Sequence, residues 1–483
     1  MVDRIFPRII QGGMGAGVSN WQLARAVSMR GQLGVVSGTV IDLILTRRLQ
    51  LGDPGGHMRR ALSALPDPNV ARRILDQYFI PGGKAPDQPF AGKPMVGLKP
   101  GRHLEELLVA ANFVEVYLAK EGHDGVVGIN YLNKIQTPLL PSLYGAILAG
   151  VDYIIVGAGI PVAIPGILDN LCRLESASLE LTVRGAEGEQ KHTMTFDPKR
   201  FFDGPVPSLR RPGFFPILSS VTLANMLIKK CSGKVDGLII EGPSAGGHNA
   251  PPRGHPKLSS EGEPVYGVRD EIDLTAIQSL ELPFWLAGSY GSPRKLQEAT
   301  AAGASGVQVG LLFAFCEESG LREDLKRDII QRALQGQLRV FTDPIASPAG
   351  FPFKVLVLKG TLSESNIYQK RYRHCDLGYL REAIELPDGT LVWRCPAEDP
   401  ESYVRKGGRR EDTVGRKCLC NGLMANIGMA QVREDHKDEL PLLTSGEDFS
   451  SIQQLVRPGE YTYSASDVID FLLSPYPIQA GKE

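Results

Sequence analysis

Two short glycine-containing segments carry the strongest chemical signal in the sequence. AGSYGS (287–292) and GVQVGLLFA (306–314) each contain an apolar run that stops at a glycine, Gly288 or Gly310, shortly before a helix is expected to begin. Free backbone N–H groups at a helix start attract an anion, and glycine lets the backbone approach it closely. The alternative is that these glycines only make tight turns, but two such segments in succession favour a phosphate-binding site.

A histidine follows another apolar run, in the segment IIEGPSAGGHNAPPRG (239–254). Glu241 and His248 lie on either side of a stretch of small residues, so a carboxylate and an imidazole can meet at one place. Histidine acts as a general acid or base near neutral pH. A single histidine is often a structural group instead, but its position in a glycine-rich loop after a strand favours a catalytic role for His248.

Further residues offer contacts to a flat ring. QGGMGAGVS (11–19) supplies backbone amides and the thioether of Met14, unless it forms only a strand–helix turn. Asn130, near the end of the apolar run GINYL, presents an amide to a heterocycle. Ser219 and Ser220 offer hydroxyl groups of the same kind, or else cap the helix that follows them.

Four cysteines lie close together in the sequence, between residues 375 and 420. Cys375, Cys395, Cys418 and Cys420 are soft ligands that would suit a structural zinc ion. No pair among them has the C-x₂-C spacing of common zinc sites, so they are alternatively ordinary buried or free thiols.

Eight short apolar runs, rich in β-branched residues, alternate with longer stretches typical of helices. Runs of this kind are typical of parallel strands buried on both faces. The runs span residues 5–12, 33–38, 126–132, 153–158, 215–220, 237–242, 283–288 and 306–310, and helices are expected at 21–30, 142–149, 222–230 and 295–302. We therefore predict an α/β fold, a TIM (β/α)₈ barrel whose active site lies at the carboxyl ends of its strands. An open doubly wound sheet is the alternative, but no G-x-G-x-x-G follows the first strand.

The predicted barrel occupies residues 1–340 and carries two loop insertions, at about 43–125 and 170–212. The first contains a helical stretch at 104–120, and the second contains a hairpin made by LELTVR and HTMTF around GAEGEQ. Residues 341–483 form a C-terminal extension that contains the cysteine cluster. Insertions on barrel loops often shape a substrate pocket.

Composition gives no reason to expect a nucleic-acid or membrane partner. The 483 residues are 42% hydrophobic and 22% charged, with a formal net charge of −1. No run approaches the roughly 18 uncharged apolar residues of a membrane span, and charges near the start argue against a signal peptide. Seven cysteines do not suggest a disulfide framework, so a cytoplasmic location is expected.

Taken together, these motifs resemble one family. QGGMGAG, GINYL, GAGIP (157–161), EGPSAGGH, AGSYGS and GVQVG follow, in this order, the pattern of nitronate monooxygenases, formerly called 2-nitropropane dioxygenases. The same superfamily includes flavin-dependent enoyl-acyl carrier protein reductases and the trans-acting enoyl reductases of polyketide and polyunsaturated fatty acid synthesis. The resemblance covers about residues 5–355, and TDPIASPAGFPFKVL (342–356) is similar to the family's segment after the barrel.

The resemblance implies FMN as the cofactor and assigns its contacts by position. Gly13, Met14 and Asn130 would contact the isoalloxazine ring or the ribityl chain. Gly246 and Gly247 would lie beside the flavin, and His248 would be the catalytic histidine of the AGGH motif. The phosphate end would be held by Gly288, Ser289, Gln308, Gly310 and Leu311, and Ser220 and Glu241 join the cofactor-binding candidates.

Departures from the family pattern bear on the substrate. Ser289 replaces the second glycine of the usual pair after the seventh strand, and Leu311 replaces the usual threonine after the eighth. Both positions still offer backbone amides, so FMN remains the expected cofactor. The tail HNAPPRG lacks the glycine that monooxygenases tend to have two residues after the histidine, and it is closer to the trans-acting reductases.

The resemblance implies an FMN-dependent oxidoreductase of the nitronate monooxygenase type, which oxidises alkyl nitronates with O₂. The alternative is an NAD(P)H-dependent enoyl-thioester reductase, and the basic run 405–417 would then dock an acidic carrier protein. A third alternative is a protein that binds flavin or another phosphate-bearing ligand without turnover, although His248 argues against it. The sequence leaves open whether the chain forms a homo-oligomer.

Overall fold

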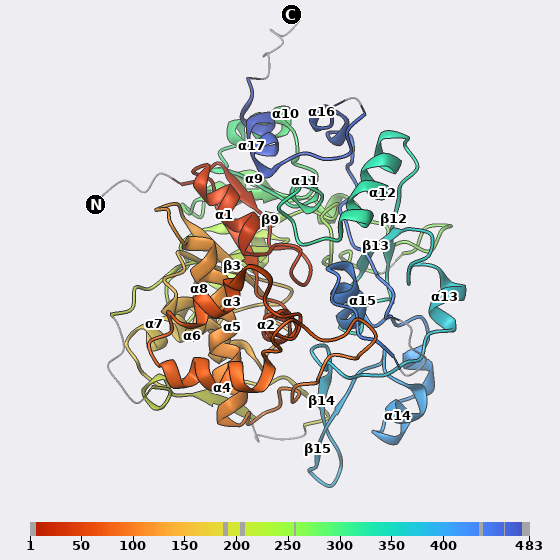
Figure 1. The fold of residues 1–483 in the computed structure, drawn as a ribbon. Helices are drawn as coiled ribbons and strands as arrows, with labels where there is room; N and C mark the ends of the chain where they lie inside the picture. The colour runs from red at the N-terminus through yellow and green to blue at the C-terminus, as the bar shows by residue number, and fades with distance from the viewer. Residues whose placement is uncertain are drawn as a thin grey trace, which may run out of the picture.

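Eight strands of the computed structural model pair in parallel and close into a barrel (Figure 1). The order is β1-β11-β10-β9-β8-β4-β3-β2, and a parallel bridge between Ile10 and Leu33 joins the two ends of the sheet. The strands are β1 (Ile9–Gln11), β2 (Gly34–Ser37), β3 (Val127–Leu132), β4 (Tyr153–Gly157), β8 (Gly213–Leu218), β9 (Leu238–Glu241), β10 (Phe284–Ala287) and β11 (Gly306–Val309). Each overlaps one predicted run, and the predicted TIM barrel is confirmed. The structure describes residues 6–186, 192–202, 208–255, 257–433, 438–457 and 459–475.

Alternate strand residues fill the inside of the barrel, because successive side chains of a strand point to opposite faces. Three aromatic rings stack there: the ring centroids of Tyr153 and Phe215 are 4.7 Å apart, and those of Phe215 and Trp285 are 4.9 Å apart. Trp285 Nε1 donates a hydrogen bond to the carbonyl of Pro7 at 2.8 Å. The interior is therefore a packed apolar core, which leaves the strand ends as the place for a ligand.

Helices follow the barrel strands and pack outside them. They are α1 (Trp21–Met29), α5 (Arg102–Lys120), α6 (Leu139–Leu148), α7 (Ile164–Cys172), α8 (Val221–Lys230), α9 (Leu274–Gln278), α10 (Pro293–Ala301), α11 (Leu311–Ala314) and α12 (Glu323–Leu334). Several begin at a polar side chain that accepts a hydrogen bond from the first turn, which satisfies a backbone N–H without an intrahelical partner. These N-cap residues are Asn20, Ser220, Asp273 and Ser292.

The first predicted insertion folds into helices. Besides α5, it holds α2 (Ile41–Gln50), α3 (His57–Leu62) and α4 (Pro68–Tyr78). Helix α5 packs against α1 and α6 and so serves as the barrel helix between β2 and β3. Its buried Glu106 pairs with Arg73 at 2.7 Å and with Arg102 at 3.0 Å, which ties α4 to the barrel.

The second insertion contains the predicted hairpin. Strand β5 (Ala177–Glu180) pairs antiparallel with β7 (Thr193–Phe196), while part of the expected turn, residues 187–191, lies outside the described residues. The two-residue strand β6 (Val183–Arg184) pairs in parallel with β14 (Glu382–Glu385). The second insertion and the C-terminal extension thus contribute strands to the same small sheet.

The C-terminal extension runs across the carboxyl end of the barrel and returns to its outer helices (Figure 1). Helix α17 lies beside α1 and α10, which are far from it in the sequence. The elements from residue 339 on are β12 (Arg339–Asp343), β13 (Phe353–Val357), α13 (Ser365–Gln369), β14, β15 (Leu391–Arg394), α14 (Pro400–Arg405), α15 (Leu419–Asn426), α16 (Ile452–Leu455) and α17 (Ala465–Leu473). Single 3₁₀ turns occur at Pro54–Gly56, Pro198–Arg200, Val268–Asp270 and Arg410–Thr413.

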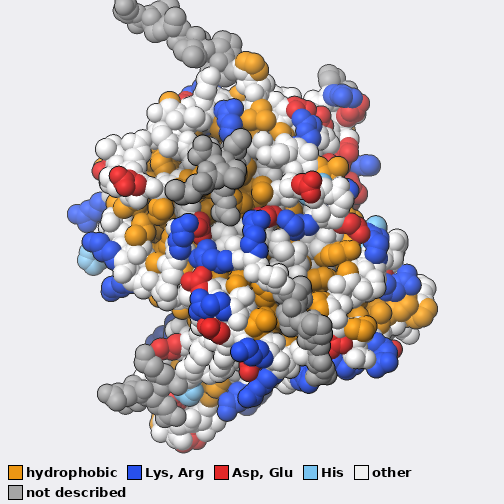
Figure 2. Space-filling view, turned by 90° about the vertical axis from the view of Figure 1, so that its left-hand side faces the viewer, with side chains coloured by type: hydrophobic (Ala, Val, Ile, Leu, Met, Phe, Trp, Pro, Cys, Tyr) orange, Lys and Arg blue, Asp and Glu red, His pale blue; other side chains and the backbone are white. Residues whose placement is uncertain are grey.

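The surface mixes charges of both signs. On the face that Figure 2 shows, basic and acidic side chains are interspersed with apolar ones, in keeping with the net charge of −1. Over the part of the chain that the structure describes, none of the helices has the length and apolar character needed to cross a membrane.

Candidate active site

A cavity of about 260 Å³ opens at the carboxyl ends of the barrel strands. Loops after six strands and residues 443–448 of the extension form its wall. Small-molecule sites typically measure about 300–1,000 Å³, so the cavity is close to that range. All the predicted catalytic and cofactor-binding residues except Ser220 line it: Gly13, Met14, Asn130, Glu241, Gly246, Gly247, His248, Gly288, Ser289, Gln308, Gly310 and Leu311.

The loop after β1 is held by a buried serine. Ser19 Oγ accepts hydrogen bonds from Gln11 Nε2 at 2.8 Å and from the backbone N–H of Met14 at 2.9 Å. This loop lies against β3 so closely that a Cβ at Gly13 would be 2.4 Å from the Cβ of Asn130. Only glycine fits there, so no side chain covers the backbone that faces the cavity.

The glycine loops after β10 and β11 meet the other loops at the cavity. Gly288 has φ +95° and Ser289 has φ +57°, so the chain turns sharply through left-handed conformations as β10 ends. A Cβ at Gly310 would be 3.4 Å from the sulfur of Met14, which places the loops after β1 and β11 in contact. The two segments predicted to bind phosphate therefore lie beside the predicted ring-binding loop.

His248 is half-buried under the first part of the extension. Its Nε2 forms a hydrogen bond with Ser347 Oγ at 2.7 Å, and its ring meets that of Phe353 edge-on with centroids 4.9 Å apart. The backbone of Gly247 accepts a hydrogen bond from Lys354 N–H at 2.9 Å, which fixes the loop. Burial, reinforced by the positive charge of Lys134, lowers the pKa of His248 well below its usual value, so the imidazole is neutral at pH 7.

Glu241, at the end of β9, lines the main cavity and a second, smaller cavity that also contains Arg253 and Tyr266. Burial raises the pKa of Glu241 to about 8. Its carboxyl group therefore holds a proton at pH 7 and can donate a hydrogen bond as well as accept one.

Lys134 is an ionisable residue near the site whose role no sequence pattern indicated. Its Nζ lies 3.8 Å from the centre of the Phe351 ring, a cation–π contact. Within the described residues this Nζ is buried without a hydrogen-bond partner, and burial lowers the pKa of Lys134 to about 7. The residue follows the GINYL motif by two positions, but nothing in the local sequence indicates burial.

The part of the cavity wall formed by residues 443–448 was also not predicted from the sequence. Thr444 Oγ1 accepts a hydrogen bond from the backbone N–H of Gly247 at 2.9 Å. A Cβ at Gly246 would be 2.8 Å from the backbone N of Gly446, so the two segments are in direct contact. Nearly 200 residues separate these partners and no recognisable motif marks the second one, so sequence reasoning had no signal for it.

Ser220 does not line the cavity. Its Oγ accepts a hydrogen bond from the backbone N–H of Leu223 at 3.1 Å, which caps helix α8. The structure therefore favours the capping role over cofactor binding for this residue.

The basic run Arg405–Lys417 is largely engaged in local ion pairs. Lys406 pairs with Glu398 at 2.6 Å, Arg409 pairs with Asp412 at 2.8 Å, and Arg410 pairs with Glu401. Such pairs neutralise much of the charge that a carrier protein would otherwise meet.

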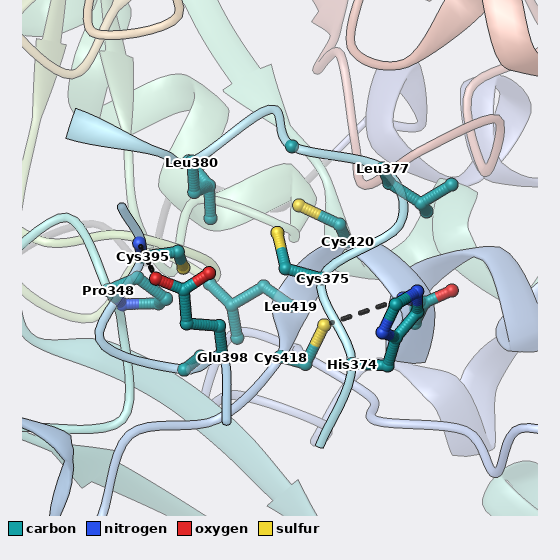
Figure 3. Close-up of a pocket in the computed structure, with 13 residues that line it drawn as sticks. Pro348, His374, Cys375, Leu377, Leu380, Cys395, Glu398, Cys418, Leu419 and Cys420 are labelled. Carbon is teal, nitrogen blue, oxygen red and sulfur yellow. Dashed lines mark hydrogen bonds between the residues drawn. The ribbon is translucent and has the colours of Figure 1, made fainter. Parts of the chain in front are cut away.

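The four predicted zinc ligands come together, but not as a metal site. Cys375, Cys395, Cys418 and Cys420 all line one small cavity of about 10 Å³ (Figure 3). Across the described ranges, no group of three or more His, Cys, Asp or Glu side chains is arranged to hold a metal ion. The Cys418 sulfur instead contacts Asn421 Nδ2 at 3.6 Å. The expected structural zinc is therefore not supported.

Two curated proteins match part of the chain. A probable nitronate monooxygenase of Bacillus subtilis is 30% identical over 126 residues, which are 26% of this chain and 34% of that protein. A (3aS,4S,5R,7aS)-5-hydroxy-7a-methyl-1-oxo-octahydro-1H-indene-4-carboxyl-CoA dehydrogenase of Rhodococcus jostii is 29% identical over 119 residues, 25% of this chain and 30% of that protein. The chain thus spans about a third of the length of these relatives.

Solved structures resemble the chain over nearly its whole length, but loosely. FabK from Thermotoga maritima is 15% identical, with a TM-score of 0.46 and coverage of 97% of this chain and 92% of that chain. The enoyl reductase domain of MlnA from Bacillus amyloliquefaciens is 11% identical, with a TM-score of 0.46 and coverage of 97% and 95%. A nitroalkane oxidase from Streptomyces ansochromogenes is 15% identical, with a TM-score of 0.43 and the same coverage.

The family model for nitronate monooxygenase matches residues 194–345. This stretch includes strands β8 to β11, the loop that carries His248, and both glycine loops expected at a phosphate. Over this part of its length the chain thus matches the nitronate monooxygenase family, and the resemblance that its motifs indicated is confirmed.

Proposed function

We propose that this chain is an FMN-dependent oxidoreductase of the nitronate monooxygenase type, which oxidises alkyl nitronates with O₂. The observation that carries the proposal is the convergence of the predicted glycine loops, Asn130 and His248 on one cavity at the carboxyl end of a (β/α)₈ barrel. The family match supports it, because residues 194–345 contain His248 and the glycine loops after β10 and β11.

The residues at the cavity fit a flavin mononucleotide. Asn130 Oδ1 is buried and has no hydrogen-bond partner in the described part of the chain, so it suits an N–H donor of a heterocycle. Because Gly13 has no side chain, its backbone leaves a flat surface beside Asn130. We assign Gly13, Met14 and Asn130 to the ring, with Gly246 and Gly247 beside it. Gly288, Ser289, Gln308, Gly310 and Leu311 are assigned to the phosphate end.

FMN, when bound, supplies an acceptor for the electrons of the substrate. The protein's part is to bind, orient and shield that substrate. Neutral His248 can take a proton from the reacting carbon of a nitroalkane, the conjugate acid of a nitronate. Ser347 holds the imidazole through Nε2, and Phe353 and Thr444 cover the loop, which keeps water from the reacting carbon.

A second candidate function is NAD(P)H-dependent reduction of an enoyl thioester. One observation favours it: Glu241 lines the cavity and keeps its proton at pH 7, because burial raises its pKa to about 8. Reduction of the double bond requires a proton at the α-carbon, and a neutral carboxylic acid can supply it. Oxidation of a nitronate requires no such acid.

The deciding experiment mixes the FMN-loaded protein with an alkyl nitronate or with NADPH in the absence of O₂. Bleaching of the flavin's visible absorbance by the nitronate, with recovery when O₂ is admitted, is the result expected. Bleaching by NADPH alone selects the reductase, and a set of enoyl thioesters then serves as substrates. A colourless protein that cannot be reconstituted with FMN would refute both functions.

Two variants separate cofactor binding from folding in this experiment. Asn130→Ala is expected to weaken flavin retention, because the amide beside the ring is lost. Ser220→Ala is the matched control outside the cavity: it removes a helix cap, at a cost of about 1 kcal/mol in stability, and leaves flavin binding unchanged.

A further inference from the structure

Lys134 carries a buried amine to which the proposed oxidoreductase chemistry gives no role. Its Nζ has no hydrogen-bond acceptor within the described residues. The Nζ lies 3.8 Å from the centre of the Phe351 ring, and this π-face replaces only part of the hydration that the amine has lost. A buried amine without an acceptor is suited to bind an anion that enters from solvent.

Lys134 lies close to His248, the candidate base. It follows β3 by two residues, and Leu132, the last residue of that strand, lines the main cavity. The Phe351 ring that contacts the Lys134 Nζ also meets the imidazole of His248 edge-on, with ring centroids 6.4 Å apart. The amine and the imidazole therefore lie against the same aromatic ring, and the imidazole lines the cavity.

The wall of the main cavity offers an anion no other amine. Besides His248 and Tyr290, the ionisable side chains that line it are carboxylic acids: Glu241, Glu447 and Asp448. Within the described residues, no lysine or arginine lines the cavity. Lys354, a buried lysine behind the wall, is already paired with Glu447 and donates a hydrogen bond to Thr342 at 2.8 Å. Lys134 is the amine near His248 whose donors are still available.

The substrate of the proposed reaction brings negative charge to this place. A nitronate carries its charge on the oxygens of its nitro group, and the same charge develops there when a base removes a proton from the carbon of a nitroalkane. His248 is the proposed base, so an ammonium group beside it can stabilise this charge as it forms. The flexible four-carbon stem of lysine lets Nζ move from the Phe351 face toward the cavity.

We propose that Lys134 is the anion-binding residue of the candidate active site, and that its ammonium group binds the nitro oxygens of a nitronate beside His248. This inference rests on the proposed nitronate chemistry. Burial lowers the pKa of Lys134 to about 7, so anion binding is strongest below pH 7 and weakens as the amine loses its proton. Glu241, whose pKa is about 8, weakens it further at higher pH, whereas His248 stays neutral.

Nitrate tests the anion site without any turnover. It is a planar anion whose oxygens are arranged like those of a nitro group, and it has no carbon that the enzyme could oxidise. Calorimetric titration of the FMN-loaded protein with nitrate at several pH values measures the affinity. We expect the affinity to fall about tenfold between pH 6 and pH 8, because the protonated fraction of an amine with a pKa of about 7 falls by that factor.

Three variants assign the effect to Lys134. Lys134→Met removes the charge, and we expect nitrate affinity at pH 6 to fall and the KM of an alkyl nitronate to rise, each about 10- to 100-fold. Lys134→Arg keeps its charge at every pH used, so binding should persist without a decline below pH 8. Lys234→Met is the matched control, since Lys234 is 76% exposed and precedes β9, at the end of the barrel opposite the cavity.

The proposal is overturned if Lys134→Met binds nitrate as tightly as the natural protein does at pH 6. It is also overturned if nitrate affinity is equal at pH 6 and pH 8, or if Lys134→Arg shows the same decline, which would assign that decline to Glu241. Should Lys134→Met fail to fold, the natural protein and Lys134→Arg decide by pH dependence alone. Nitrate binding that depends on Lys134, in a protein that oxidises no nitronate, would refute the proposed function and retain the anion site.

Discussion

Burial sets the protonation state of the ionisable side chains around the candidate active site. Glu241 keeps its proton at pH 7 because burial raises its pKa to about 8, and His248 stays neutral because burial lowers its pKa. Lys134, whose pKa falls to about 7, is the ionisable neighbour that still carries partial positive charge at that pH. A nitronate or an enolate, both anions, would therefore meet the neutral acid Glu241 and the neutral base His248, with Lys134 nearby and Glu447 and Asp448 in the wall of the cavity.

The hydrogen bond between His248 and Ser347 allows the role of each side chain in turnover to be tested separately. His248→Gln removes the proton acceptor at similar size, and with a neutral nitroalkane as substrate we expect turnover to fall about 10²- to 10⁴-fold with the flavin still bound. Ser347→Ala removes only the hydrogen bond to the imidazole Nε2. Such a bond contributes about 1 kcal/mol, so we expect turnover to decrease about fivefold. Steady-state kinetics recorded beside the flavin spectrum measures both. Equal losses in the two variants would contradict the separate roles.

Glu241 gives a stability prediction with a definite sign. Its pKa is about 8 in the folded protein and about 4.3 in an unfolded chain, so between these values the folded state binds the extra proton. Stability therefore decreases as pH rises from about 4.3 to about 8. Glu241→Gln removes this penalty, and we expect the variant to gain on the order of 1 kcal/mol relative to the natural protein at pH 8 and nothing at pH 4. Chemical denaturation at the two pH values measures the difference, and an equal effect at both would refute the raised pKa.

At the scale of elements, the loops after the strands were predictable because their constraint is local. A run of β-branched residues that ends at a glycine predicts a buried strand followed by a turn without a side chain at the glycine. The loops at Gly13, Gly288 and Gly310 follow this rule. Helices α2 to α4 were not predicted, because they are held by partners distant in sequence. The buried pair of Arg48 with Glu115 is one such contact, between α2 and α5.

Close packing between two loops makes Gly13 a test at this scale. Gly13→Ala would place a methyl group 2.4 Å from the Cβ of Asn130, so the loops after β1 and β3 must separate. We expect a destabilisation of about 2 kcal/mol and loss of the flavin, because both loops contribute to the ring site. Gly92→Ala is the matched control, since a Cβ there meets no atom within 4 Å. Thermal unfolding and flavin content are measured for both. If Gly13→Ala retains flavin as the control does, the ring site lies elsewhere.

At the scale of the whole molecule, the extension completes the site that the barrel begins. The barrel and its glycine loops could be predicted, since strand, turn and helix signals lie within a few residues of each other. The closing wall could not, because Thr444 and Ser445 form it by tertiary contact with Gly246 and Gly247. The return of α17 to the barrel is also absent from any local pattern, although Tyr463 Oη donates to the carbonyl of Leu312 at 2.9 Å just before this helix.

Because α17 packs on the barrel, we expect the C-terminal extension and the barrel to unfold in one cooperative transition. Ile469 on this helix is 1% exposed, and Ile469→Ala is expected to cost about 2–5 kcal/mol, because it removes buried methyl groups and leaves a cavity. The adjacent Asp470 pairs with Arg30, the residue that follows α1, at the surface, where the two side chains are 64% and 39% exposed. Exposed pairs contribute about 0–1 kcal/mol, so Asp470→Asn is the matched control with little effect. Denaturant unfolding should show one transition that Ile469→Ala shifts as a whole. A separate early transition in that variant would mean that the extension unfolds by itself, and that the barrel retains its stability without the wall that closes the active site.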